Sequence, residues 1–310
     1  MKKIVILQRS GNELANQLWN YASIYAYALE RGFELENPSF FEYGNHFTML
    51  VSPGFKFFFF NPFTNYTKRK TALKRRIWRK FYFWYAKRRL ETMDNQTIHY
   101  ENPSNAPYYL APTKESTGKL LELEKREGNI YLDSWLFRNP AGLQKYRGEI
   151  LRYFKPRADT ETAIEKNIRR LRTTYTSVIG VHIRQGDYET WRGGAYFVPQ
   201  ARVREILDEC IKMSGQNAAD ICFVITSDGR IDEKIFDGLN VFISKENAVH
   251  DLFLLAKTDV VIGSNSTFGA FASYYGNIPF IVMQKEAMDW KYYSDKKSYF
   301  ENKYSTFVCY

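Results

Sequence analysis

The sequence predicts an α/β fold with a parallel sheet, and two observations in its second half support this class. Five short β-branched runs are typical of buried strands: 178–183, 221–226, 241–243, 260–263 and 280–283. Helical patterns fill the gaps, with apolar residues spaced by three and four and a third helix after Ser266 (Val203, Ile206, Leu207, Cys210; Leu252, Leu255, Ala256). Strands that alternate with helices indicate a doubly wound, mononucleotide-type domain over roughly residues 156 to 285.

The first half opens with a similar unit. Residues 4–7 (IVIL) predict a buried strand, 10–12 a turn, and the following apolar positions one face of a helix (Leu14, Leu18, Tyr21, Tyr25, Ala28). From about Phe33 to Pro112 the pattern is irregular and predicts no element.

An amphipathic segment, 160–172, precedes the second domain, and Lys155-Pro156 marks the expected boundary. The length of 310 residues exceeds the size at which single cores usually stop growing. We therefore expect two lobes, 1–155 and 156–310.

Composition restricts the partner and the compartment. The net charge of +10 favours an anionic partner, whether a phosphorylated small molecule, an acidic lipid surface or nucleic acid. The cysteines (Cys210, Cys222, Cys309) are odd in number and lack metal-type spacing, which fits a reducing compartment. The apolar run 4–7 is too short for a signal peptide and 57–60 too short for a membrane span. We expect a soluble or peripheral cytoplasmic protein.

The tract Lys68 to Arg89 contains eleven basic residues, no acidic one and several large aromatic residues. This composition suits an anionic membrane interface, or stacking and phosphate contacts on nucleic acid. The alternative is a solvated helix whose aromatic side chains face the core. Of the three interpretations we rank the solvated helix first, membrane association second and nucleic-acid binding last.

Polar residues follow the predicted strands at their carboxyl ends, where open α/β sheets bind ligands. His182, Arg184 and Asp187 come after the strand 178–183. Arginine pairs bidentately with phosphate, and Asp187 is placed to orient such a fork. An ion pair that only ties down a loop is the structural alternative.

Three more candidates lie at strand ends or helix starts. The segment 263–269 (GSNSTFG) joins a strand to a helix, so backbone N–H groups and the Ser266 and Thr267 hydroxyls can bind an anion there; simple N-capping is the alternative. Asp228 is either a turn former or a ligand contact. Asp251 begins a helical run, as a helix cap or as a contact to a nucleotide base.

Several nucleotide motifs are missing. The sequence has neither GxxxxGK[ST] nor a GxGxxG after a strand, so P-loop hydrolysis and dinucleotide binding have no support. There is no Asp-x-Asp pair, and the four histidines lack metal-ligand spacing (His46, His99, His182, His250). A divalent-metal mechanism is disfavoured, which leaves Arg184 as the best group to neutralise phosphates.

Together these loops resemble the three peptide motifs of the α1,2/α1,6/protein O-fucosyltransferase superfamily, and most closely the bacterial α1,2-fucosyltransferase family. The segment 182–188 (HIRQGDY) is similar to the first motif, HxRRxDY, with Gln185 in place of the second arginine. Residues 223–229 and 251–276 are similar to the second and third motifs. The segment 11–22 resembles the family's glycine-rich GNQ segment, although it reads SGNELANQ where the family has GGLGNQ.

The resemblance implies a GT-B architecture of two Rossmann-like lobes, with GDP-fucose bound by the C-terminal lobe, the acceptor by the N-terminal lobe, and no metal or cofactor. It implies that Arg184 pairs with the diphosphate and that Asp251 accepts hydrogen bonds from guanine. The implied donor-binding set is His182, Arg184, Asp228, Asp251, Ser266, Thr267 and Phe268, and the acceptor-side loop holds Gly11, Asn16 and Gln17. Arg184 and Asp187 are the expected catalytic residues, and Asp187 and Glu13 the candidate general bases.

We therefore expect an inverting, metal-independent fucosyltransferase that acts on a cell-surface glycan, on a galactoside 2-OH, from the cytoplasmic face of the membrane. The alternatives are a GT-B enzyme that uses another nucleotide sugar, and a non-enzymatic basic protein that binds membranes or nucleic acid through residues 68–89.

Overall fold

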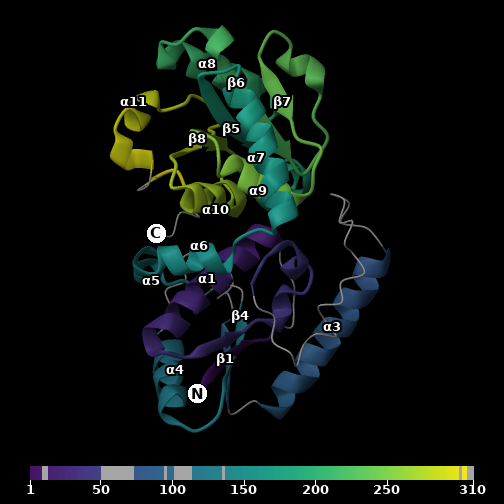
Figure 1. Ribbon diagram of the computed structural model, residues 1–310, viewed down its shortest axis with the longest axis vertical. Helices are drawn as coiled ribbons and strands as arrows, with labels where there is room; N and C mark the ends of the chain where they lie inside the picture. The colour runs from purple at the N-terminus through teal and green to yellow at the C-terminus, as the bar shows by residue number, and fades with distance from the viewer. Residues whose placement is uncertain are drawn as a thin grey trace. The chain divides into compact units, whose positions relative to one another are not determined.

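The computed structural model describes residues 1–8, 13–49, 73–93, 96–100, 114–134, 137–299 and 302–305. The chain divides into two compact units, Met1–Arg157 and Ala158–Val308, hereafter unit 1 and unit 2. Each unit contains one sheet in which every strand pairing is parallel (Figure 1). The expected α/β class and the parallel sheet expected in the C-terminal half are confirmed, and the sheet of unit 1 is parallel as well.

Unit 1 is built on a four-stranded sheet in the order β2-β1-β4-β3. The strands are β1 (Lys3–Ile6), β2 (Glu34–Glu36), β3 (Thr97–Tyr100) and β4 (Ile130–Ser134). The described helices are α1 (Leu14–Arg31), α3 (Leu73–Thr92), α4 (Lys114–Lys125), α5 (Pro140–Lys145) and α6 (Arg147–Tyr153), with short 3-10 turns η1 (Pro38–Phe40) and η2 (Gly44–His46). The predicted first strand and helix are confirmed; the predicted turn at 10–12 lies outside the described residues.

Unit 2 contains a five-stranded sheet in the order β7-β6-β5-β8-β9. Its strands, β5 (Ser177–Ile183), β6 (Ile221–Ser227), β7 (Val241–Ile243), β8 (Val260–Gly263) and β9 (Phe280–Val282), confirm all five predicted runs. The helices are α7 (Ala158–Arg172), α8 (Gln200–Ser214), α9 (Ala248–Leu255), α10 (Thr267–Gly276) and α11 (Trp290–Tyr293), with 3-10 turns η5 (Gly186–Glu189), η6 (Trp191–Gly194), η7 (Ala218–Asp220), η8 (Glu233–Phe236) and η9 (Lys296–Tyr299).

Helices cover both faces of the unit 2 sheet. On one face, Ile179, Val181 and Ile183 of β5 form a buried cluster with the apolar side of α8. Successive side chains of a strand alternate between faces, so Gly180 and His182 point to the other one. There Gly180 lies against Leu255 and Thr258, at the end of α9. Burial on both faces explains why the β5 sequence is a continuous apolar run up to His182.

The strand order places a switch point at the carboxyl end of β5. Along the chain, β6 lies on one side of β5 and β8 on the other, so the connections from β5 and β8 leave in opposite directions. In open α/β sheets the crevice outside this point is the usual ligand site. His182, Arg184 and Asp187 lie there.

Candidate active site at the carboxyl ends of the unit 2 strands

Arg184 is held by two carboxylates immediately after β5. Its Nη2 atom donates to Asp187 Oδ1 at 2.7 Å, and its Nη1 atom forms an ion pair with Asp228 Oδ2 at 2.8 Å. The Arg184 side chain is largely buried, whereas the Asp187 side chain is 55% exposed. The guanidinium plane is therefore fixed before any ligand arrives.

Asp228 joins the loop after β6 to the loop after β5. Its Oδ1 atom accepts a hydrogen bond from the backbone N–H of Gln185 at 2.7 Å, in addition to the Arg184 ion pair. Gly186 makes this approach possible: its φ is +27°, and a Cβ there would lie 2.4 Å from Asp228 Oδ2. Asp228 is thus more than a local turn former, because it fixes both the backbone and the side chain of the motif that contains Arg184.

His182 lies under this loop and is buried. Its Nδ1 atom is 3.3 Å from Thr226 Oγ1 on β6, and its ring stacks on Phe268 of α10 with centroids 4.5 Å apart. The next strand also contributes, because the N–H of Arg184 donates to Ser264 Oγ at 3.0 Å. Residues at the ends of both neighbouring strands, β6 and β8, therefore hold His182 and Arg184 in place.

The N-terminus of α10 lies beside these residues. Ser266 is the N-cap residue, and its side chain makes no capping hydrogen bond. The Ser266 hydroxyl is buried at 4% exposure and has no hydrogen-bond partner within the described ranges. A buried hydroxyl without a partner at the positive end of a helix dipole is suited to bind an anion. The alternative interpretation, in which Ser266 only caps the helix with its side chain, does not explain why this hydroxyl makes no capping hydrogen bond.

Asp251 lies inside the first turn of α9, not at its start. The predicted helix 251–256 begins at Ala248, and Asn247 caps it by accepting from the N–H groups of Val249 and His250, each at 3.0 Å. The helix-cap interpretation of Asp251 is therefore wrong. Asp251 is buried, and its carboxylate accepts a hydrogen bond from Ser244, the residue that follows β7.

A stack of aromatic and cationic groups extends from Arg184 along the loop 186–194. The Arg184 guanidinium lies 5.2 Å from the centroid of the Tyr188 ring, and Tyr188 stacks on Trp191 with centroids also 5.2 Å apart. The Arg192 guanidinium lies over the Trp191 ring, 5.2 Å from its centroid. The backbone of Arg192 is left-handed, with a φ of 51°. Lys285, just beyond β9, donates to the carbonyl of Gly194 and brings another cation to this loop.

The predicted acceptor-side residues belong to unit 1. Gly11 lies outside the described residues. Asn16 is half-buried on α1, and Gln17 is buried, with its Oε1 atom 3.5 Å from the Tyr21 hydroxyl. Tyr21 also donates to Gln8 Oε1 at 2.9 Å. Glu13, the N-cap of α1, accepts from the Tyr43 hydroxyl at 3.3 Å.

Three residues of the predicted segments to which the sequence prediction gave no individual role support the site directly. They are Ser264, which accepts from the Arg184 N–H, Thr226 beside His182, and Tyr188 under the Arg184 guanidinium. Ser264 and Thr226 each lie at the carboxyl end of a strand adjacent to β5. Their position at a strand end is the signal that identifies them, once the strand order is known.

Two further features of the described residues concern ligands. They contain no group of three or more His, Cys, Asp or Glu side chains that could hold a metal ion.

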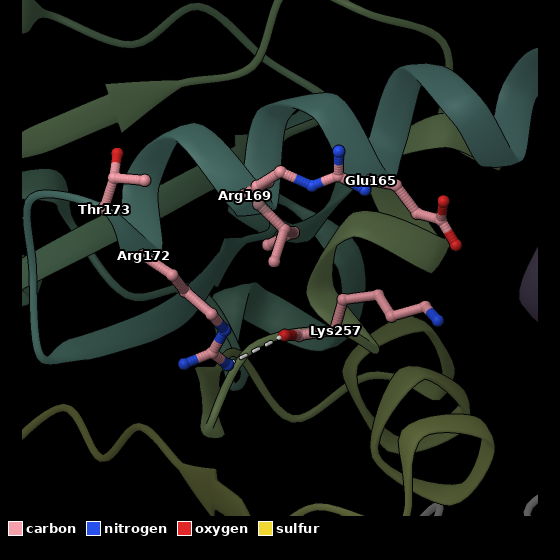
Figure 2. Close-up of a pocket in the computed structure, with 6 residues that line it drawn as sticks. Glu165, Arg169, Arg172, Thr173 and Lys257 are labelled. Atoms are coloured by element: carbon pink, nitrogen blue, oxygen red, sulfur yellow. Dashed lines mark hydrogen bonds between the residues drawn. The ribbon is translucent and has the colours of Figure 1, made fainter.

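A pocket of about 420 Å³ is lined by residues of α7, by Thr173 and by Lys257, and Figure 2 shows Arg169, Arg172 and Lys257 around it. Because Arg172 and Lys257 precede β5 and β8, this pocket lies toward the amino ends of the strands, away from Arg184.

The same fold occurs in three solved structures of fucosyltransferases. An Arabidopsis thaliana FUT1 mutant in complex with GDP matches with a TM-score of 0.55 and 13% identity, over 92% of this chain and 71% of that chain. POFUT1 in complex with GDP-fucose matches with a TM-score of 0.54 and 11% identity, over 91% and 98%. NodZ α-1,6-fucosyltransferase, co-crystallized with GDP, matches with a TM-score of 0.52 and 16% identity, over 92% and 96%.

At these identities the likeness shows a shared fold and no more. No curated protein matches the sequence. The family model described as Glycosyl transferase family 11 matches residues 140–305, which is more than half of the chain. This chain belongs to glycosyl transferase family 11.

Proposed function

We propose that this protein transfers fucose from GDP-fucose to a galactoside 2-OH of a cell-surface glycan, with inversion at the anomeric carbon and without a metal. Membership of glycosyl transferase family 11 supports sugar transfer, and the GDP and GDP-fucose in the FUT1, NodZ and POFUT1 structures support the donor. The observation that carries the proposal is the Arg184 guanidinium, fixed by two carboxylates beside the α10 N-terminus.

Arg184 would act on the departing GDP. Breaking the bond between the fucose C1 and the β-phosphate oxygen moves negative charge onto the diphosphate. A hydrogen-bond donor that is positioned at a developing negative charge lowers the activation free energy by about 3 kcal/mol. Because Asp187 and Asp228 already hold the guanidinium, little reorganisation is needed when that charge develops. The Ser266 hydroxyl, Thr267 and the α10 dipole would add to this stabilisation.

Inversion follows from direct displacement. The acceptor hydroxyl oxygen bonds to C1 on the face opposite the leaving phosphate. The bond from C1 to the phosphate oxygen breaks and its electron pair stays on GDP, while the acceptor proton passes to a base or to water. Asp187 and Glu13 are the two candidate bases. We assign Asp187 as a positioning residue, because its carboxylate pairs with Arg184 at 2.7 Å. A displacement with much bond breaking before bond making needs little base assistance.

Residues at the carboxyl ends of the strands and in the adjacent helices would bind the nucleotide base. We propose that His182 and Asp228 line the nucleotide site with Phe268, and that Asp251 accepts hydrogen bonds from guanine, which uracil does not reproduce. We also propose that the two units are the two lobes of a GT-B enzyme. Unit 2 would bind the donor, and unit 1, with Gly11, Asn16 and Gln17, the acceptor.

Gln185, the departure from the family motif, has its side chain engaged within unit 2. Its Nε2 atom donates to the Val198 carbonyl at 3.4 Å, and its Oε1 atom accepts from Gln200 Nε2 at 3.4 Å. These contacts tie the loop after β5 to the start of α8. They support a structural task for Gln185 and leave Arg184 as the motif's contact to the diphosphate.

The test is thermal stability with saturating GDP, UDP, ADP or CDP in EDTA. A ligand at about 100 times its Kd stabilises by about 2.7 kcal/mol, which corresponds to several degrees in Tm. We expect a selective rise with GDP, followed by transfer of fucose from GDP-fucose but not of sugar from GDP-mannose or UDP-sugars. An equal response to all diphosphates would overturn the donor assignment, and a response that requires Mg²⁺ would overturn metal independence.

A further inference from the structure

Helix α3 in unit 1 has an inner face that is locked to the sheet. Tyr82, Ala86 and Leu90, spaced by four residues, are buried against Val5, Leu7, Phe41 and Tyr131. The Tyr82 hydroxyl lies 2.6 Å from Ser39 Oγ, which donates to the Ile6 carbonyl of β1 at 2.9 Å. Burial raises the pKa of Tyr82 well above its ordinary value, so this hydroxyl stays protonated. These contacts fix the rotation of α3 about its axis.

The opposite face of α3 exposes large apolar side chains. Ile77, Phe81 and Trp84 are 58%, 43% and 57% exposed and are spaced by four and three residues, so they form one stripe along the helix. The described part of the chain exposes only six such residues, and three of them are in this stripe. A contiguous apolar stripe of this kind marks an interaction surface, unlike scattered exposed residues.

Cations border this stripe. Helix α3 contains eight Lys or Arg residues and one acidic residue, Glu91. At about 100° per residue, Lys80 and Lys87 lie along one side of the stripe, and Arg88 continues it one turn beyond Trp84. All three are exposed, and the Arg88 side chain is 70% exposed. The outer surface of α3, defined as Ile77, Lys80, Phe81, Trp84, Lys87 and Arg88, is therefore both apolar and positively charged.

We propose that this outer surface of α3 docks on an anionic lipid bilayer, with the helix lying in the membrane plane. Aromatic side chains such as Trp84 partition to the headgroup level, and basic residues beside them are attracted by anionic lipids. The inner face holds unit 1 to the docked helix. Charge complementarity selects the bilayer over a second copy of the chain, because a two-fold dimer through this surface would bring like charges together.

Binding to lipid vesicles tests the proposal on the full-length protein. We expect co-sedimentation with vesicles that contain phosphatidylglycerol, weaker binding to phosphatidylcholine alone, and loss of binding as NaCl rises. In vesicles of brominated phosphatidylglycerol, tryptophan fluorescence should be quenched, and Trp84→Phe should remove most of that quenching although the other five tryptophans remain.

Two double variants separate the apolar and electrostatic contributions. Phe81→Ser/Trp84→Ser should weaken partitioning about 30-fold, since each half-exposed ring contributes about 1 kcal/mol. Lys80→Gln/Lys87→Gln should weaken it by about 30-fold as well, at about 1 kcal/mol for each basic residue. The matched controls are Met213→Ser, at a residue that is 61% exposed on α8, and Lys166→Gln/Arg169→Gln, at two residues that are exposed on α7. Both should bind like the wild type.

The outcomes that overturn the proposal are distinct from a failure of the enzymatic one. Wild-type-like binding by Phe81→Ser/Trp84→Ser at unchanged Tm would exclude the outer surface of α3. A dimer in sedimentation velocity that this variant dissociates, without vesicle binding, would assign the surface to self-association. Salt-sensitive binding to single-stranded RNA without vesicle binding would assign it to nucleic acid. Turnover with a water-soluble acceptor should stay at the wild-type level in every α3 variant.

Discussion

The contact between Gly186 and Asp228 allows a sharp test of the site. Gly186 has a left-handed φ of +27°, and a Cβ there would approach Asp228 Oδ2 to 2.4 Å, closer than side chains tolerate. The carboxylate cannot simply turn away, because it accepts from the Gln185 N–H at 2.7 Å and pairs with Arg184 at 2.8 Å. Gly186→Ala should therefore displace Asp228 and release one side of the Arg184 guanidinium.

The magnitude follows from these contacts. A left-handed φ costs an L-residue roughly 1–2 kcal/mol. Loss of one charge-assisted hydrogen bond adds about 2 kcal/mol. The matched control is Gly215→Ala at the end of α8, where φ is +65° and nothing lies within 4 Å of the added Cβ. With about 1.5 kcal/mol for the left-handed φ in both variants, Gly186→Ala should lower the Tm by about 10 °C and Gly215→Ala by about 5 °C, at roughly 3 °C per kcal/mol for a unit of this size.

Differential scanning fluorimetry measures both Tm values, and calorimetric titration measures GDP affinity. We expect Gly186→Ala to bind GDP at least tenfold more weakly and Gly215→Ala to bind it like the wild type. Equal losses of Tm in the two variants would refute the steric argument. A large loss of Tm with unchanged GDP affinity would keep that argument but remove the Asp228 and Arg184 pair from the nucleotide site.

Three other predictions concern the site and the core. Arg184→Lys keeps the charge but loses the planar fork, so turnover should fall at least tenfold at unchanged Tm; wild-type-like turnover in a fucose-transfer assay would remove Arg184 from the mechanism. Asp251→Asn should weaken GDP binding at least tenfold in calorimetry, because the proposed carboxylate contact to guanine is lost, while weak UDP binding stays the same. Burial raises the pKa of Cys210 and Cys222 to about 11, so in a Cys309→Ser background mass spectrometry should find neither thiol alkylated by iodoacetamide until urea unfolds the protein.

The unit 2 elements were predictable because each strand is a short apolar run between clear helical patterns. Predicted and observed bounds of β7 and β8 are identical, and β5 and β6 differ by one residue at an end. Strands buried on both faces carry this continuous pattern, which is easily distinguished from the spacing of a helix. The positions of the unit 2 strands along the chain are thus encoded locally.

Unit 1 was less predictable for identifiable reasons. Strand β2 has three residues, Glu34–Glu36, and only its middle residue is apolar, so no pattern marks it. Helix α3 has apolar residues on opposite faces, Tyr82 inside and Trp84 outside, which cancels the periodicity that normally identifies an amphipathic helix. The expectation of a helix with aromatic residues facing the core holds for Tyr82 and fails for Phe81 and Trp84.

The relations among the site residues depended on strand order, which periodicity does not contain. Each of Arg184, Asp228 and Ser264 was visible as a polar residue after a strand. In the structure Ile183 pairs with Ser227, so Arg184 and Asp228 are the next positions along two adjacent parallel strands. On the other side His182 pairs with Gly263, and Ser264 follows.

Because β5 is the central strand, the residue that follows it, Arg184, contacts the loops after both neighbouring strands, β6 and β8. This explains why Arg184 combines an ion pair to Asp228 with a backbone hydrogen bond to Ser264. An arginine at the end of β7 or β9 would have one such neighbour, and its guanidinium would depend on longer, exposed contacts. The central strand is therefore the position at which a sheet of this order can fix a cation most firmly, and the motif that contains Arg184 follows that strand.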